Sequence, residues 1–229
     1  MPQIYKLSRT GLKYLYKIRH HKGHGIHSPF VYNLVRKVIE EKTPYYVYED
    51  LKLYIQGKPY LKKRIGKYNR LSFRLVNYFG AKHILEIGSG YGVNTLHLTV
   101  ASKDIECVCT ESDPSKLGIA HRLLDGWERK VSFVEMEELP QIKEKQDCIF
   151  IDLSYCKSID IDFVKHLLLS VSHENTFVVV KGIRTNKRCQ VLWKGICDMD
   201  TRTAMLDLFS VGIVFFDKKL YRWNYKISY

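Results

Sequence analysis

The chain has 229 residues, of which 45% are hydrophobic, and it carries a formal net charge of +13. This composition argues against a disordered chain, and the length suits one domain with a sizeable core or one domain with an appendage. The longest apolar runs, such as Thr176–Val180 and Gly212–Phe216, have the length of strands and are far too short to span a bilayer. Residues 1–19 lack the uninterrupted apolar segment of a secretory signal.

The excess of positive over negative charge lies in the first third of the chain. Residues 1–82 hold 18 Lys and Arg against 4 Asp and Glu, whereas residues 83–229 hold 19 against 20. The same first third contains 11 of the 16 tyrosines. We therefore expect two parts, a basic, Tyr-rich helical N-terminal cap over residues 1–81 and an α/β domain over residues 82–229.

The six cysteines contain no C-x-x-C pair, which argues against a zinc site. Cys107 and Cys109 are expected to share one buried face of a strand, where small apolar side chains are common. This cysteine usage predicts a reduced, cytoplasmic setting.

The N-terminal third reads as a series of helices. Ile4, Leu7, Leu15 and Ile18 recur at helical spacing beside a stripe of basic residues. Ser28-Pro29 is a strong helix start, with serine as the N-cap and proline at the first helical position, and Thr43-Pro44 is expected to end that helix. Further helices are predicted at Tyr46–Ile55 and at Lys67–Phe79, the latter stopped by Gly80.

From Lys82 onward, strands alternate with helices. The predicted strands are His83–Ile87, Ile105–Thr110, Val131–Glu135, Cys148–Ile151 and Thr176–Lys181. The predicted helices are Val93–Ala101, Pro114–Trp127, Glu137–Ile142, Ser158–Ser172 and Asn186–Cys197. Strands that alternate with helices of this length predict parallel pairing in a doubly wound α/β sheet. The tail from residue 203 has strand-like segments without helices, three of them where two are expected, and predicts an antiparallel addition at one sheet edge.

The most informative stretch is ILEIGSGYG at residues 84–92. Glu86 lies near the end of the first strand, and Gly88, Gly90 and Gly92 follow at alternate positions. Three glycines indicate that a ligand lies against bare backbone. A dinucleotide-binding loop has the spacing G-x-G-x-x-G, whereas position 93 here is valine, and that alternative leaves Glu86 without a role.

This loop resembles the first motif of the class I S-adenosylmethionine-dependent methyltransferases, acidic-x-G-x-G-x-G. The resemblance implies a Rossmann-like fold with a mostly parallel seven-stranded sheet and antiparallel C-terminal strands. It also implies that Glu86, Gly88, Ser89, Gly90 and Gly92 contact S-adenosyl-L-methionine. The segment HGHGIHSPFVY is similar to the N-terminal segment of a group of bacterial O-methyltransferase-like proteins, which names no substrate.

Further acidic residues follow the next strands, as the resemblance requires. Glu111, followed by Ser112, ends the second strand, where the family binds the ribose hydroxyls. Met136-Glu137 follows the third strand, where the family more often has Gly-Asp beside the adenine. Asp152 ends the fourth strand, near the position of the transferred methyl group.

Methyl transfer to a hydroxyl requires close positioning of the acceptor and removal of a proton. The candidate bases are Asp152, His24 and His27, of which His27 immediately precedes the Ser28 cap. Metal-dependent small O-methyltransferases carry an Asp-Asn pair after the fifth strand, where this chain has Lys181-Gly182. Since a lysine repels a divalent cation, no catalytic metal is expected. Lys181 is expected to bind an anionic substrate group or to pair with Asp152.

These features predict an S-adenosylmethionine-dependent enzyme that methylates a hydroxyl of a small-molecule or lipid-like, anionic acceptor. A basic, Tyr-rich region also suits RNA, so an RNA methyltransferase is the alternative. The same region suits an anionic membrane surface, with peripheral attachment of a cytoplasmic protein to the inner membrane face. A non-catalytic cofactor-binding or membrane-associated module is the third hypothesis.

Overall fold

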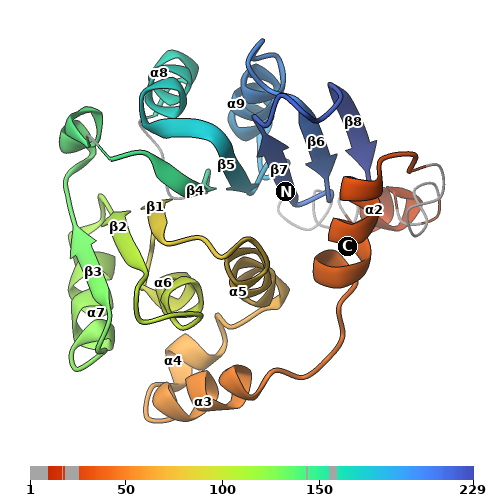
Figure 1. Cartoon of the computed structure of the whole chain (residues 1–229). Helices are drawn as coiled ribbons and strands as arrows, with labels where there is room; N and C mark the ends of the chain where they lie inside the picture. The colour runs from red at the N-terminus through yellow and green to blue at the C-terminus, as the bar shows by residue number, and fades with distance from the viewer. Residues whose placement is uncertain (1–9, 17, 19–25, 143, 155–158) are drawn as a thin grey trace.

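A computed structural model describes residues 10–16, 18, 26–142, 144–154 and 159–229, apart from the side chains of Pro59, Glu137 and Pro140. Its centre is a mixed eight-stranded sheet with strand order β3-β2-β1-β4-β5-β7-β6-β8 (Figure 1). The strands are β1 (His83–Ile87), β2 (Glu106–Thr110), β3 (Lys130–Phe133), β4 (Gln146–Asp152), β5 (Ser172–Lys181), β6 (Ala204–Asp207), β7 (Val211–Phe215) and β8 (Trp223–Lys226).

The first five strands pair in parallel, which confirms the doubly wound arrangement. The order reverses between β1 and β4, so the carboxyl ends of these two strands border the crevice in which such folds bind ligands. Of the tail strands, β7 is antiparallel to both β5 and β6.

The sheet has eight strands rather than the seven expected. The additional strand is β8, the third strand-like segment of the tail, which pairs with the outer edge of β6. It runs parallel to β6, so the antiparallel character of the tail resides in β7 alone. Edge strands offer unpaired backbone groups, and β8 supplies partners for those of β6.

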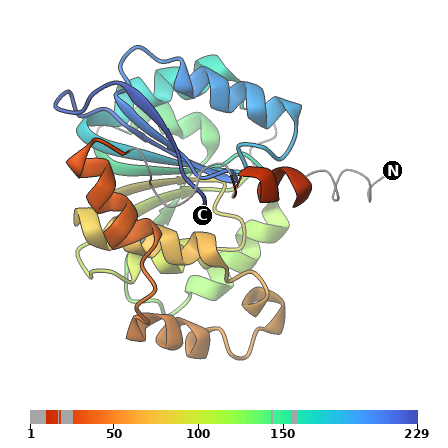
Figure 2. The same cartoon turned by 90° about the vertical axis from the view of Figure 1, so that its right-hand side faces the viewer.

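Helices cover both faces of the sheet (Figure 2). Their bounds are α2 (Pro29–Leu34), η1 (Val35–Ile39), α3 (Tyr46–Tyr54), α4 (Pro59–Lys62), α5 (Lys67–Phe79), α6 (Val93–Thr99), α7 (Pro114–Leu124), η2 (Met136–Gln141), α8 (Ile161–Val171) and α9 (Lys187–Cys197). Side chains of α2, η1, α5 and α6 pack on one face, and those of η2, α8 and α9 pack on the other. The helices α3 and α4 form an outer layer against α6 and α7.

The predicted helix signals have their expected local roles. The Ser28 side chain accepts a hydrogen bond from the backbone N–H of Val31, and proline follows at the first helical position of α2. Gly80 ends α5 with a left-handed backbone, φ 62°. The helix that starts at Pro29 continues as a π-helical turn and ends at Ile39, before the predicted end at Thr43-Pro44.

The N-terminal third packs directly on the sheet. Val31 and Leu34 of α2 lie in the same buried cluster as Leu206 of β6 and Ile227 beyond β8. Residues 10–16 and 18 form a further helix, whereas the predicted apolar positions Ile4 and Leu7 lie outside the described residues. Within the part of the chain that the structure describes, no helix is both long and apolar enough to cross a membrane. The division into two parts stays a prediction.

Gly212 of β7 shows how closely α9 packs on the sheet. A Cβ atom at this position would lie 2.1 Å from the ring of Trp193 on α9, far inside contact distance. We therefore expect Gly212→Ala to lower the free energy of unfolding by about 1–3 kcal/mol, because the indole or the strand must shift. Urea denaturation measures this change.

The matched control is Gly57→Ala, since nothing lies within 4 Å of a Cβ built at Gly57. Its unfolding free energy should stay within about 0.5 kcal/mol of the parent value. Equal denaturation midpoints for the two variants would show that Trp193 moves aside without cost.

Candidate functional site

The glycine loop lies between β1 and α6, at the crevice. Gly88, Gly90 and Gly92 have φ angles of 80°, 63° and 77°, which are all in the left-handed region that favours glycine. A Cβ at Gly92 would also lie 3.3 Å from Ala120 of α7. The three glycines therefore let the backbone turn sharply and lie close to its surroundings.

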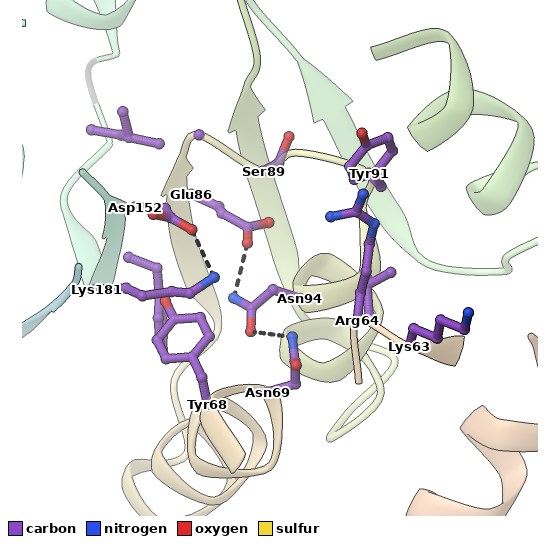
Figure 3. Close-up of a pocket in the computed structure, with 14 residues that line it drawn as sticks. Lys63, Arg64, Tyr68, Asn69, Glu86, Ser89, Tyr91, Asn94, Asp152 and Lys181 are labelled. Carbon is purple, nitrogen blue, oxygen red and sulfur yellow. Dashed lines mark hydrogen bonds and ion pairs between the residues drawn. The ribbon is translucent and has the colours of Figure 1, made fainter. Parts of the chain in front are cut away.

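A cavity of about 260 Å³ opens beside this loop (Figure 3). Residues from β1, β4, β5, α5, α6 and the segment before α5 form its walls. They are Lys63, Arg64, Tyr68, Asn69, Glu86, Ile87, Gly88, Ser89, Tyr91, Val93, Asn94, Phe150, Asp152 and Lys181.

Glu86 is a buried carboxylate in the wall of this cavity, with 3% of its surface exposed. Its Oε1 accepts a hydrogen bond from Asn94 Nδ2 at 2.9 Å, and its Oε2 accepts one from Thr95 Oγ1 at 2.5 Å. Asn94 in turn accepts a hydrogen bond from Asn69 Nδ2 at 3.3 Å. Burial raises the pKa of Glu86, and these hydrogen bonds oppose that shift. A cation in the cavity would stabilise the ionised carboxylate.

Asp152 and Lys181 face each other at the carboxyl ends of β4 and β5. The two residues are register partners, and Lys181 Nζ donates to Asp152 Oδ2 at 2.7 Å. The other oxygen, Oδ1, accepts from the backbone N–H of Ser154 at 3.0 Å. The Lys181 ammonium lies 4.8 Å from the ring centroid of Tyr68, whose pKa is raised by burial and by nearby carboxylates. The ion pair expected between Lys181 and Asp152 is therefore present.

Glu111 anchors the backbone of the glycine loop through hydrogen bonds. It follows β2, and its carboxylate oxygens accept hydrogen bonds from the backbone N–H groups of Gly90, at 2.8 Å, and Asp113, at 2.9 Å. Lys116 Nζ lies 3.9 Å from Oε1. Each oxygen keeps a lone pair beyond these bonds, but the side chain is only 1% exposed and does not line the cavity.

The structure brings some of the sequence-predicted residues together in the cavity and places others outside it. Glu86, Gly88, Ser89 and Asp152 line the cavity. The other predicted residues are outside its lining, namely His27, Gly90, Gly92, Glu111, Ser112 and Met136. Gly90, Gly92 and Glu111 still shape the loop. His27 and Ser112 are exposed and Met136 is half-buried, whereas His24 and the side chain of Glu137 lie outside the described part of the chain.

Several cavity residues carry no signal that the sequence patterns above could detect. Lys63 and Arg64 follow the short helix α4, and Tyr68 and Asn69 lie in the first turn of α5. Asn94, eight residues after Glu86, also points into the cavity (Figure 3). A partial signal was available in Asn69, one of three polar side chains that α5 buries among apolar ones.

The cavity can hold a ligand that carries charges of both signs. Its walls combine two carboxylates with three cationic side chains and expose the backbone of the glycine loop. The amino-acid end of S-adenosylmethionine is a zwitterion beside a sulfonium, and its nucleoside needs an open backbone surface. The residues present therefore fit this cofactor.

No protein-family model and no curated protein sequence matches the chain. Solved structures do match, and three of them show the range of organisms. An O-methyltransferase from Bacillus cereus in complex with SAH is 20% identical, with a TM-score of 0.56 over 81% of this chain and 97% of that one. The SAH-bound methyltransferase PaMTH1 from Podospora anserina is 13% identical, with a TM-score of 0.58 over 83% and 97%.

The third is the O-methyltransferase TomG from Streptomyces achromogenes, involved in tomaymycin synthesis and solved in complex with SAM. It is 16% identical, with a TM-score of 0.55 over 80% of this chain and 94% of that one. At sequence identities this low, the similarity shows the fold and does not identify the substrate. The sheet order, the crevice and these likenesses agree, and the chain has the Rossmann-like fold of the S-adenosylmethionine-dependent methyltransferases.

Proposed function

We propose that the protein is an S-adenosylmethionine-dependent methyltransferase that acts on a hydroxyl of a small-molecule or lipid-like, anionic acceptor. The observation that carries this proposal is the left-handed glycine loop beside a cavity that contains Glu86 and Asp152. All three solved structures named above hold SAH or SAM, and two of them are O-methyltransferases.

In this proposal, the glycine loop and its neighbours bind the cofactor. Glu86, Gly88, Ser89, Gly90 and Gly92 hold its amino-acid end and ribose on the loop. Glu111 and Ser112 bind the ribose hydroxyls, and Met136 with Glu137 borders the adenine. The bonds that fix Glu111 to the loop support its assignment, because a ribose-binding carboxylate must be held in one position.

We assign the proton acceptor to Asp152, which lines the cavity at the end of β4. The ammonium of Lys181 donates a hydrogen bond to Asp152 Oδ2 at 2.7 Å, which orients the carboxylate. A positioned general base contributes roughly 10²–10⁴-fold to such reactions. His27 is the second candidate, and its exposed position outside the cavity lining makes it the weaker one.

We propose that this chemistry needs no metal ion. Lys181 is the last residue of β5 and lies next to Asp152, and an ammonium there disfavours a divalent cation through charge repulsion. Methyl transfer should therefore stay within about twofold of its initial rate after EDTA treatment, because EDTA removes only metal ions and the proposed reaction uses none. The measurement is the rate of label transfer with EDTA, with added Mg²⁺ and with neither. Loss of transfer in EDTA and its return with Mg²⁺ would contradict a metal-free mechanism.

The experiment that tests the function combines binding and transfer. Calorimetry should detect binding of S-adenosylmethionine to the purified protein, and incubation with methyl-labelled cofactor and fractionated cell extract should label one small-molecule or lipid fraction. Binding without label in any fraction would favour a non-catalytic module. Absence of binding would overturn the proposal.

An RNA methyltransferase is the second candidate, because residues 1–82 carry the excess of positive charge. The same extract experiment separates the two, since label would then enter the RNA fraction. RNA that co-purifies at low salt and dissociates at high salt would support this candidate. Sedimentation with anionic vesicles would instead support attachment to a membrane surface.

A further inference from the structure

The cavity contains more positive charge than its carboxylates neutralise. Lys181 pairs with Asp152 at 2.7 Å, and Glu86 accepts hydrogen bonds from Asn94 and Thr95. Lys63 and Arg64 are the other two cations of the lining. Among the residues that the structure describes, no carboxylate lies within 4.0 Å of either side chain's charged nitrogens. These two cations are therefore available to an anionic ligand.

Arg64 is an exposed residue whose guanidinium lies against the glycine loop. Its guanidinium carbon lies 3.8 Å from the ring centroid of Tyr91, the residue between Gly90 and Gly92 (Figure 3). Stacking on an aromatic ring occupies the face of the guanidinium and leaves its N–H edges for hydrogen bonds. A planar edge with parallel donors matches the two oxygens of a carboxylate. Lys63, the preceding residue, also lines the cavity and is a second cation of the lining.

The carboxylates Glu86 and Asp152 lie in the same small cavity as this cationic pair. A ligand with an ammonium and a carboxylate on one carbon matches such an arrangement better than a simple anion does, since each charge meets its opposite. We propose that Arg64, together with Lys63, binds the carboxylate at the amino-acid end of S-adenosylmethionine. This inference depends on the proposed cofactor, and the acceptor's anionic group is the other source of the same chemistry.

The test uses two ligands that differ only in the carboxylate. These are S-adenosylmethionine and decarboxylated S-adenosylmethionine, and their affinities for the parent protein and for Arg64→Ala are measured by calorimetry. Loss of a charge-assisted hydrogen-bonded pair should weaken S-adenosylmethionine binding about 10- to 100-fold. Binding of the decarboxylated compound should stay within about twofold or improve, because removal of Arg64 also removes a like charge.

Two further variants serve as controls. Arg64→Lys keeps the charge and loses the planar edge, so it should retain part of the discrimination between the two ligands. Lys62→Ala removes an exposed cation one residue before Lys63, outside the cavity lining, and should leave both affinities unchanged. Thermal melting of each variant reports whether the fold is intact.

The outcomes separate this inference from the proposed function. Equal weakening of both ligands in Arg64→Ala would show that Arg64 supports the loop and would overturn the carboxylate assignment. Unchanged binding of both ligands, with a raised KM for the labelled acceptor fraction, would overturn it as well and would assign the pair to the acceptor. If the parent protein binds neither these compounds nor 5′-methylthioadenosine, the proposed cofactor itself fails.

Discussion

Replacing Glu86 with alanine is expected to reduce the affinity for S-adenosylmethionine about 100-fold, which calorimetry can measure. Glu86 is a buried carboxylate in the cavity wall, and both of its oxygens are held by hydrogen-bond donors from α6. The alanine variant removes a fixed negative charge that faces a cationic ligand. It also leaves the Asn94 amide and the Thr95 hydroxyl without their acceptor, which loosens the wall.

Glu86→Gln separates these two effects, because it keeps the shape and one oxygen acceptor but loses the charge. We expect an intermediate loss of about tenfold for this variant. Glu128→Ala, at an exposed position outside the cavity lining, is the matched control and should bind normally. An alanine variant with the affinity of the parent would remove Glu86 from cofactor binding.

The raised pKa of Glu86 adds a pH dependence in a defined direction. A cationic ligand favours the ionised carboxylate, so its binding releases the proton that burial helps to retain. The affinity should therefore fall as the pH is lowered through the titration of Glu86, and Glu86→Gln should flatten this slope.

The second large effect is expected in the pH dependence of folding stability. His97 of α6 is 1% exposed, and its Nδ1–H donates to the carbonyl of Val93 at 2.8 Å. Burial, with a smaller contribution from Arg70, lowers the pKa of His97 from 6.5 to about 4. The unfolded chain takes up a proton below about pH 6.5, whereas the folded chain resists protonation until about pH 4. The stability from this residue is complete above pH 6.5 and is lost as the pH falls towards 4.

The size of this loss is about 3 kcal/mol between pH 7 and pH 4, since each unit of pKa difference corresponds to about 1.4 kcal/mol. Urea denaturation of the parent and of His97→Asn at both pH values measures it. The asparagine variant should be less stable at pH 7 but should lose about 3 kcal/mol less on acidification. His166→Asn, at an exposed position of α8, should lose as much as the parent. Parallel pH profiles for His97→Asn and the parent would contradict a buried neutral imidazole.

Local patterns in the sequence predict the parallel half of the fold well. Gly88, Gly90 and Gly92 require a left-handed backbone that other residues rarely adopt, so the loop and the strand end before it follow from the residue types alone. The strands β1 to β5 and the helices between them are apolar and regularly spaced, and only their ends differ from the predictions. The helix predicted at Pro114–Trp127, for example, ends at Leu124.

The remainder depends on pairings between distant segments. Trp223–Lys226 is a plausible strand by composition, but nothing in its residues specifies that it joins β6 and runs parallel to it. Likewise, Lys63 and Arg64 reach the cavity only because α3 and α4 fold back against α6 and α7. A basic pair after a four-residue helix has no periodicity from which this position could be inferred.

The packing of α2 against β6 and the end of the chain has a consequence for the order of events during synthesis. Val31 and Leu34 share their apolar cluster with Leu206 and Ile227, and the hydroxyl of Tyr229 donates to the carbonyl of Lys67. The helix α2 is thus synthesised almost two hundred residues before the last part of its buried surface, at Ile227, is made. Until then the apolar face of α2 is exposed to solvent, and the nascent polypeptide is most vulnerable to aggregation.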